Sequence, residues 1–450
     1  MKSSAFYTLF PLRIIIILFA LFTFLHETHA QSIKKMDDAT WDAINVAVVT
    51  NFTAYQLKGL SVAVVYGGNI AYANAFGTKN VLGDPFTIYT KSLLASVSKT
   101  ITGVLAMRLV QNGDIGLDDD ISDYLPGYNN SGITIRHLLD HQSGIAHYDN
   151  CPGGYNGSFN ADDSYDVVHG CTICVTPPGS GTLYTTFGNT LLGCIISYVG
   201  TDVYGTGYQG LYQQWMRGPG NLNTLQPAHD NSDPQLAEGS EGPGYWNDIG
   251  WKLPAGGFIS DIVDLANYTR GILNNVFITQ TTFDMMKVQQ LTSGSPNHTC
   301  GDLSNSNYGL SFGLSGGITD DTFRVTHNGA NPDHGFTSHI SIYPNSNASI
   351  VILTNTGDAD AAMTAIRSDI EDLVLCPDSR NFTNDISWTE PRIFEGEQIT
   401  AQSVITSTIN DAYIFDADQW VRLLPGFEVT AGKEFQAIVW DGCGGSLHTD

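Results

Sequence analysis

The chain has 450 residues, enough for one large two-lobed domain with a small additional module, or for two to three domains. Its 45 acidic and 20 basic residues give a net charge of −25, which argues against nucleic acid and anionic membrane surfaces as partners. The same charge balance suits an exported protein that stays in solution.

The first thirty residues have the layout of a secretory signal peptide. Lys2 and Arg13 supply the positive end, residues 14–25 the apolar core, and Thr28-His29-Ala30 resembles a cleavage site. An uncleaved membrane anchor is the alternative, but the apolar run is short of the ~20 residues that span a bilayer. We therefore expect a signal peptide over 1–30, no membrane span after cleavage, and a secreted, periplasmic or cell-surface location.

Taken in chain order, the first predicted elements are a hairpin and a helix. Two β-rich runs, 60–66 and 70–76, are joined by Gly67-Gly68-Asn69 and predict an antiparallel pair. Residues 96–112 then carry apolar side chains on one face at the 3.6-residue period of a helix. Gly113 stands where a helix C-cap is expected.

The middle of the chain alternates helices with loops. A short helix is expected over 136–140, and residues 149–182 are predicted to be a loop-dominated insertion because Gly, Asp, Asn, Pro and Cys abound there. Residues 186–199 are apolar enough for a helix, 218–250 are loop-like, and 259–273 return to a helical pattern.

Three strand signals come late, at 323–328, 335–343 and 348–354, and a helix is expected over 361–375. Strands at both ends of this region therefore enclose helices and loops in its middle. This order predicts a mixed α/β lobe with a helical insertion.

The composition changes beyond Cys376. Residues 397–443 show short alternating runs separated by Pro-Gly and Ala-Gly pairs, preceded by a linker around 377–395. We expect a main domain over 31–384 and a separate small all-β module over 385–450.

Seven cysteines are consistent with an oxidising compartment. Six could pair and leave one over, and the sequence does not fix the connectivity. Cys171-Thr172-Ile173-Cys174 has the spacing of a redox or zinc half-site, but no matching second pair or histidine pair lies nearby. We therefore expect structural disulfides, no metal site and no cofactor. The seven are Cys151, Cys171, Cys174, Cys194, Cys300, Cys376 and Cys443.

Ser96-Val97-Ser98-Lys99 is the motif with the most chemical content. A three-residue step along a helix puts Ser96 and Lys99 on one side, one turn apart. The helix N-terminus favours an alkoxide there, and a neighbouring base or a desolvated lysine turns a serine hydroxyl into a strong nucleophile. By itself the spacing also fits an N-capping serine followed by a solvated lysine.

Two further motifs support the chemical interpretation. Tyr184 lies just before the predicted helix at 186, and His327-Asn328-Gly329-Ala330 closes a strand shortly before Gly335-Phe336 opens the next. Together with Ser96 and Lys99, these motifs resemble the three-motif active site of penicillin-recognising serine hydrolases. The branch is that of class C β-lactamases, D-alanyl-D-alanine carboxypeptidases and related esterases.

The resemblance covers roughly residues 40–375, and the stretches 138–145 and 254–260 support it. It implies a β-lactamase/transpeptidase-like α/β fold, in which an antiparallel sheet flanked by helices is joined to a helical lobe. The small all-β C-terminal module lies outside it. Residues 421–437 resemble short β-rich repeats appended to exported Bacteroidetes proteins, for which surface display, glycan contact and passive stabilisation all stay open.

The resemblance also implies catalytic roles. Ser96 would attack a carbonyl and form an acyl-enzyme, and Lys99 would accept or relay the proton. Tyr184, as a phenolate or through a hydrogen bond to Lys99, would act as general base and later activate water. The backbone N–H groups of Ser96 and Ala330 would form the oxyanion hole.

The expected substrate-binding residues are His327, Gly329 and Thr186. His327 replaces the lysine of the family's lysine-threonine-glycine motif, and it could bond a substrate carboxylate or shuttle protons. Thr186 stands where the family often has an asparagine, and Asn189 is on the wrong turn to replace that amide. Both departures leave the substrate open among a β-lactam, a D-Ala-D-Ala-type peptide and a carboxylic ester.

We therefore interpret the chain as an exported serine hydrolase that needs no cofactor and acts on a small-molecule or peptide substrate, with peptidoglycan as one candidate partner. The alternative is a catalytically silent, penicillin-binding-type protein that binds peptidoglycan or peptides. The intact set of Ser96, Lys99 and Tyr184 speaks against that alternative.

Overall fold

A computed structural model describes residues 32–375 except 126, 129–131, 149–150, 152–158, 229–232, 242–248 and 304–306, together with seven strands between residues 380 and 439. Among the helices of this described part, none combines the length and apolar character needed to cross a membrane.

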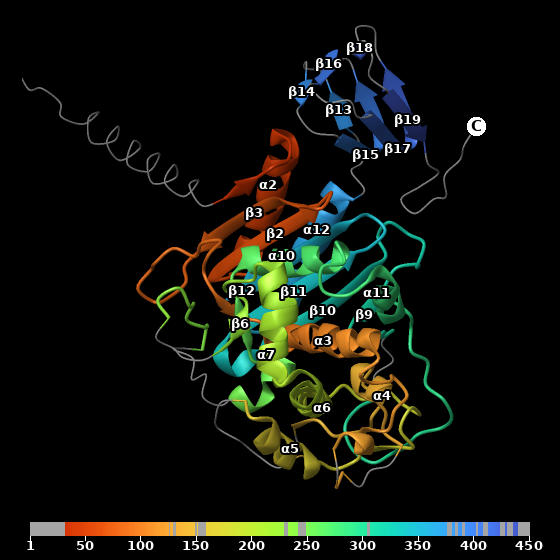
Figure 1. Ribbon diagram of the computed structural model, residues 1–450. Coiled ribbons are helices and arrows are strands. Elements are labelled where there is room, and N and C mark those ends of the chain that lie inside the picture. The colour runs from red at the N-terminus through yellow and green to blue at the C-terminus, as the bar shows by residue number, and fades with distance from the viewer. Residues whose placement is uncertain are drawn as a thin grey trace, which may run out of the picture.

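A seven-stranded antiparallel sheet forms the centre of the molecule (Figure 1). The early hairpin pairs with the late strands, as the predicted order of elements requires, and the hairpin and the three late strands are confirmed with small shifts at their ends. Across the sheet, the strands are β1 (Ile33–Lys34), β3 (Asn69–Gly77), β2 (Gly59–Tyr66), β12 (Ala348–Thr354), β11 (Phe336–Tyr343), β10 (Arg324–Asn331) and β9 (Gly313–Ser315).

The central strands are buried on both faces, because successive side chains of a strand point to opposite sides. Val62 and Ile352 face a core closed by α2 (Asp38–Ala54) and α12 (Asp360–Val374). Ala63 and Val351, one residue along each strand, face the larger core that continues into the helical lobe. Because both faces of these strands are covered, their sequences are nearly continuous runs of apolar residues.

The helical lobe packs against the second face of the sheet (Figure 1). The predicted helix at 96–112 is confirmed: it begins as a 3-10 turn and ends at Gly113, whose φ of 82° is the left-handed C-cap conformation. The lobe contains the 3-10 turn Ala95–Val97, α3 (Ser98–Asn112), α4 (Ile135–Leu139), α5 (Ala161–His169), α6 (Thr186–Tyr204), α7 (Tyr208–Tyr212), a π-helical turn Gln213–Arg217, α8 (Gly218–Gly220), α9 (Leu253–Gly256), α10 (Ile262–Leu273) and α11 (Gln280–Met286).

Shorter elements complete the described part. Three small strands form one sheet beside the helical lobe, and two more form a ladder near the disulfides. They are β4 (Ser92–Leu93), β7 (Phe258–Ser260) and β6 (Gln226–Pro227), and then β5 (Val175–Thr176) with β8 (Asn297–His298); 3-10 turns cover Ile121–Asp123, Gly250–Lys252 and Pro332–His334.

Several helices were not anticipated: α2, α5, the short α7, α8 and α9, and α11. α2 has an N-cap at Asp37 and buries Trp41, Ile44 and Val48 on one side. α5 lies inside the stretch 149–182 predicted to be loop-dominated, and the Asn160 side chain caps it. The expectation for that stretch was therefore wrong over α5.

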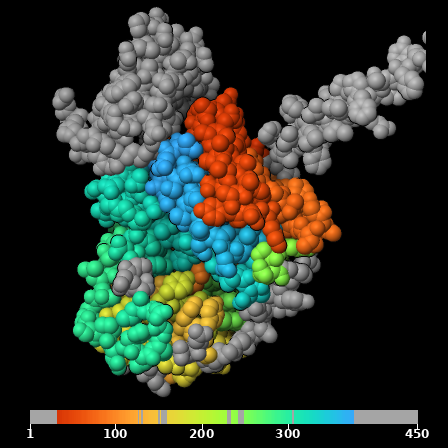
Figure 2. Space-filling model, turned by 180° about the vertical axis from the view of Figure 1, so that it is seen from behind, coloured from red at the N-terminus to blue at the C-terminus, as the bar shows by residue number. Residues whose placement is uncertain are grey.

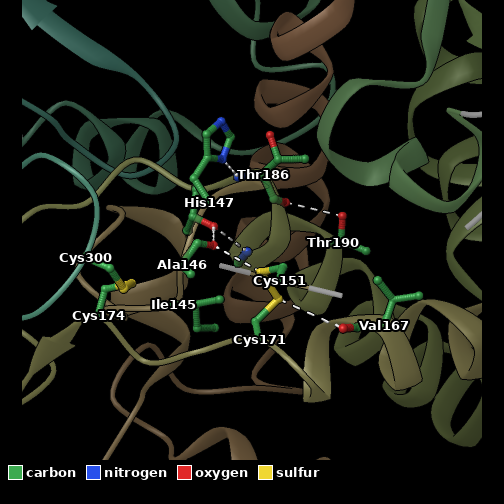
Figure 3. Close-up of a disulfide and its surroundings, with 12 residues drawn as sticks. Ile145, Ala146, His147, Cys151, Val167, Cys171, Cys174, Thr186, Thr190 and Cys300 are labelled. Carbon is green, nitrogen blue, oxygen red and sulfur yellow. Dashed lines mark hydrogen bonds between the residues drawn. A yellow bond between two sulfur atoms is a disulfide. The ribbon is translucent and has the colours of Figure 1, made fainter. Parts of the chain in front are cut away.

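Two disulfides hold the insertion: one lies within it, and the other joins it to a segment near residue 300 (Figure 3). Cys151 bonds Cys171, and Cys174 bonds Cys300. Cys171 and Cys174 take different partners, so this C-x-x-C segment holds two structural crosslinks and is not a redox pair. Cys194 is a buried free thiol in α6, whereas Cys376 and Cys443 lie outside the described residues.

The C-terminal strands pair in parallel. Tyr413 pairs with Arg392 and Phe435 pairs with Tyr413, 21 and 22 residues apart, and over all pairs of these strands the spacing runs from 19 to 24 residues. Alternate strands join two sheets, an arrangement typical of a β-solenoid. One sheet contains β13 (Arg380–Phe382), β15 (Arg392–Ala401), β17 (Tyr413–Leu423) and β19 (Phe435–Val439), and the other β14 (Ile386–Trp388), β16 (Val404–Ser407) and β18 (Glu428–Val429). The boundary at 384/385 stays a prediction.

Candidate active site

Ser96 lies in a tight turn that leads into α3. It is half-buried, and the preceding Ala95 has a φ of 45°, a left-handed conformation that costs a non-glycine residue about 1–3 kcal/mol. Two hydrogen bonds hold Leu94 in this turn. Its N–H donates to the Phe258 carbonyl at 2.8 Å, and its carbonyl accepts from Ser338 Oγ at 2.6 Å. The serine is thus fixed from two different strands.

Lys99 lies one turn further along and is 1% exposed. Its Nζ is 3.0 Å from Ser96 Oγ, 2.8 Å from the Ala255 carbonyl oxygen and 3.4 Å from Thr186 Oγ1. Burial, reinforced by the positive charge of Lys252, holds the pKa of Lys99 well below its usual range. A lysine in this state can take a proton from a neighbouring hydroxyl at moderate pH.

Tyr184 lies against Lys99, whose Nζ is 4.9 Å from the centre of the tyrosine ring. Burial raises the pKa of Tyr184, and a hydrogen bond with Ser96 acts in the opposite direction without cancelling that rise. The phenol is therefore protonated near neutral pH. This favours a proton relay through the hydroxyl over the phenolate base that the resemblance allowed.

Strand β10 forms the opposite side of the site. His327 is buried; its Nδ1 is bonded to the Asn328 carbonyl oxygen at 2.6 Å, and its Nε2 has no hydrogen-bond partner among the described residues. Burial and the charge of Lys99 lower the pKa of His327 to about 3. The imidazole is therefore neutral at physiological pH and cannot supply the charge of the lysine it replaces.

Gly329 is required where β10 passes the turn of Ser96. A Cβ atom at this position would lie 2.1 Å from the Leu94 carbonyl oxygen, far inside van der Waals contact. Ala330 follows on the same strand, pairs with Thr337 of β11 and is exposed. The strand thereby carries Ala330 to the open end of the site, beside the turn.

Ser96, Lys99, Tyr184, Thr186 and His327 come together in one place, as expected. The hydroxyl of Thr186 lies 3.4 Å from Lys99 Nζ, and its role in binding substrate stays a prediction.

Three further groups at the site were not predicted from sequence. The Nδ1 atom of His147 accepts the Thr186 N–H at 3.2 Å, the ring of Tyr148 lies 4.3 Å from that of His147, and Lys252 reaches Tyr148. Their only signal in the sequence was proximity to the family-like stretches 138–145 and 254–260.

The surface is hollowed where the sheet lobe, teal to blue, meets the helical lobe, yellow to green (Figure 2). Solved structures with the same fold include the D-amino acid amidase from Ochrobactrum anthropi SV3, with a TM-score of 0.61, 18% identity, and coverage of 74% of this chain and 99% of that one. A penicillin-binding protein from Bacillus halodurans has a TM-score of 0.57, 20% identity, and coverage of 71% and 99%.

Relatives by sequence include penicillin-binding protein 4* of Bacillus subtilis (strain 168), 32% identical over 155 residues, which are 32% of this chain. Protein flp of Staphylococcus aureus (strain MRSA252) is 26% identical over 323 residues, 66% of this chain. These matches span 32% and 60% of the relatives' own lengths. The model of the beta-lactamase family matches residues 45–372, well over half of the sequence, and the chain therefore belongs to the beta-lactamase family.

Proposed function

We propose that the protein is an exported serine hydrolase that works through an acyl-enzyme on Ser96. Family membership supports hydrolase chemistry of this kind in general. The observation that carries the proposal is the 3.0 Å approach of Lys99 Nζ to Ser96 Oγ at a lysine that is almost fully buried. A structural lysine would reach a carboxylate, whereas in the described residues this one contacts a hydroxyl pair and a carbonyl.

The proton path follows from the protonation states. Neutral Lys99 takes the hydroxyl proton as Ser96 Oγ bonds to the substrate carbonyl carbon, and the carbonyl oxygen becomes an oxyanion. The backbone N–H groups of Ser96 and Ala330 stabilise that oxyanion. Lys99 then returns the proton through the Tyr184 hydroxyl to the leaving group, whose bond to carbon breaks. Water, deprotonated along the same path, releases the acid and regenerates Ser96.

Two features favour an ester or a peptide over a β-lactam as substrate. Thr186 has no amide to contact an acylamino side chain, and its hydroxyl is directed to Lys99. His327 is neutral and offers no permanent charge. We expect 4-nitrophenyl esters to be hydrolysed faster than nitrocefin by the same preparation, and near-diffusional β-lactam turnover of ~10⁸ M⁻¹s⁻¹ would contradict this expectation.

Covalent labelling tests the nucleophile. A fluorescent phosphonate should label the mature protein once, with the added mass on the peptide that contains Ser96, and Ser96→Ala should stay unlabelled. Ser98→Ala is the matched control, because Ser98 lies in the same motif but its Oγ accepts from the Phe258 N–H. A folded wild-type protein that takes no label and hydrolyses no ester would contradict the proposal and favour the silent binding protein.

A further inference from the structure

A second lysine lies close to the catalytic candidates. Lys252 ends the 3-10 turn before α9, the element whose Ala255 carbonyl contacts Lys99. A Cβ atom added to Gly256 would lie 4.0 Å from Lys252 Cδ and 3.8 Å from the Ala95 carbonyl carbon, so the Lys252 stem and the turn of Ser96 both lie next to Gly256. The charge of Lys252 contributes to the lowered pKa of Lys99.

Lys252 has no acidic partner within the described ranges. Its Nζ donates to Tyr148 Oη at 3.3 Å and lies 5.3 Å from the ring centre of Tyr148 and 5.9 Å from that of Trp251. By contrast, Lys34, Lys91 and Lys287 each lie within 2.8 Å of an aspartate oxygen. Within the described residues, the Lys252 ammonium thus has no carboxylate beside it, and an ammonium in this state can bond an anionic group of a ligand.

The surroundings of the nucleophile are positive although the chain is strongly acidic. Among the described residues, the charges that shift the pKa values of Lys99, His141 and His327 come from lysines and histidines and from no carboxylate. Because His327 and Lys99 are both held toward their neutral forms, Lys252 is the cation left to meet an anionic group. A local positive field also raises the encounter rate with anionic substrates.

An exposed aromatic side chain, backed by buried ones, accompanies this cation. Tyr148 is 46% exposed, and its ring lies 5.8 Å from that of the buried Phe187, which in turn lies 4.9 Å from the ring of the buried Trp251. Arrangements of this kind combine apolar contact area with one fixed charge. They suit an organic group that ends in a carboxylate.

We propose that Lys252, together with the Tyr148 hydroxyl, binds a carboxylate of the substrate and makes the enzyme selective for esters or amides that carry a free acid. This inference rests on the proposed hydrolase function and names its substrate class. The carboxylate would bond the Lys252 ammonium and the Tyr148 O–H on the helical-lobe side of the site, away from His327 on β10.

The test uses matched pairs of substrates that differ in charge. One pair is 4-nitrophenyl hemisuccinate and 4-nitrophenyl succinamate, with the acid on the acyl side; the other is 3-carboxyphenyl acetate and 3-carbamoylphenyl acetate, with the acid on the leaving group. The readout is the ratio of kcat/KM for the acid to that for the amide, measured for each variant on the pH plateau, so that a change in Lys99 ionisation does not enter.

In at least one pair, the wild type should have the higher kcat/KM on the acid. Lys252→Gln should lower the ratio of acid to amide kcat/KM about tenfold or more, because KM for the acid rises. Lys252→Arg should restore most of that ratio, and Tyr148→Phe should lower it by a smaller factor. Lys35→Gln is the charge-matched control, since Lys35 follows β1 at the sheet edge opposite β10 and β9. It should leave both pairs unchanged.

An unchanged ratio in Lys252→Gln, or equal losses on acid and amide, would overturn the inference while Ser96 labelling and ester turnover keep the hydrolase proposal. A wild-type protein that the phosphonate does not label and that hydrolyses no ester would instead overturn the hydrolase proposal. The two failures are therefore distinguishable.

Discussion

The site lies between two walls of different construction. The strand wall, β10 with β11, presents His327 and Gly329 from a ladder in which seven consecutive residue pairs are in register. The loop wall, residues 141–148 with 183–186, has little regular structure. A ladder satisfies its own backbone hydrogen bonds, whereas an irregular segment needs side chains to do so and can be restrained by crosslinks.

The loop wall shows how that need is met. Thr185 Oγ1 donates to the Ala146 carbonyl at 2.8 Å, and the N–H groups of Thr185 and Thr186 donate to Nδ1 of His141 and of His147. The Cys151–Cys171 and Cys174–Cys300 disulfides lie beside this network (Figure 3). Tyr184, the one proposed catalytic group on this wall, is thus held by neighbours distant in sequence.

The largest expected effect is the loss of kcat when Lys99 or Tyr184, which lie beside Ser96, is replaced. Lys99→Ala and Tyr184→Phe should each lower kcat by about 10³-fold or more, and the double variant should be little worse, because residues that act as a unit are not additive. Steady-state and single-turnover ester hydrolysis measures this. Multiplicative losses in a well-folded double variant would show independent roles.

The second-largest expected effect is a loss of unfolding free energy when either disulfide beside the loop wall is removed. Replacing Cys174 and Cys300 by serine removes a crosslink over 126 residues, which is expected to cost up to about 5 kcal/mol of unfolding free energy. The Cys151 and Cys171 pair closes 20 residues and should cost about 3 kcal/mol. Urea unfolding of the two double-serine variants checks the order, and the reverse order would contradict it.

Replacing one threonine in each wall compares how much a lost side-chain hydrogen bond lowers the unfolding free energy there. Thr185→Val removes a fully buried donor to the Ala146 carbonyl and should cost about 1–3 kcal/mol, with a loss of kcat through Tyr184. Thr326→Val on β10 removes a similar bond to the Ile340 carbonyl, at 2.8 Å, from a half-buried site in a ladder. It should cost under about 1 kcal/mol. Equal losses in urea unfolding would show that the ladder gives no such protection.

The smallest effect is a shift in the pH profile. Because the pKa of Lys99 is well below its usual range, kcat/KM on a neutral ester should rise with pH well below the ordinary lysine value as Lys99 loses its proton. Lys252→Gln removes a positive neighbour, so the charged form of Lys99 is less disfavoured and the acid limb should move to higher pH. A limb that stays in place would show that the Lys252 charge does not act on Lys99.

Much of this arrangement could be predicted from the sequence. The S-x-x-K spacing, the strand that carries His327-Asn328-Gly329, the hairpin and the helix ended by Gly113 depend on neighbours a few residues apart, where periodicity and turn chemistry are informative. The parallel pairing of the C-terminal strands was not anticipated, because the direction of pairing is set by contacts between strands 19 to 24 residues apart.

The tertiary structure alone decided the properties that depend on burial and on distant partners. Lys99 and Thr186 meet across 87 residues, and the pairing of Cys174 with Cys300 spans 126. The pKa values of Lys99 and His327 are lowered because folding removes water from both and brings cations near, which no local pattern encodes. The sequence by itself therefore determined which chemical groups are present and in what order, and the packing of the two walls decided their charge, their partners and their orientation.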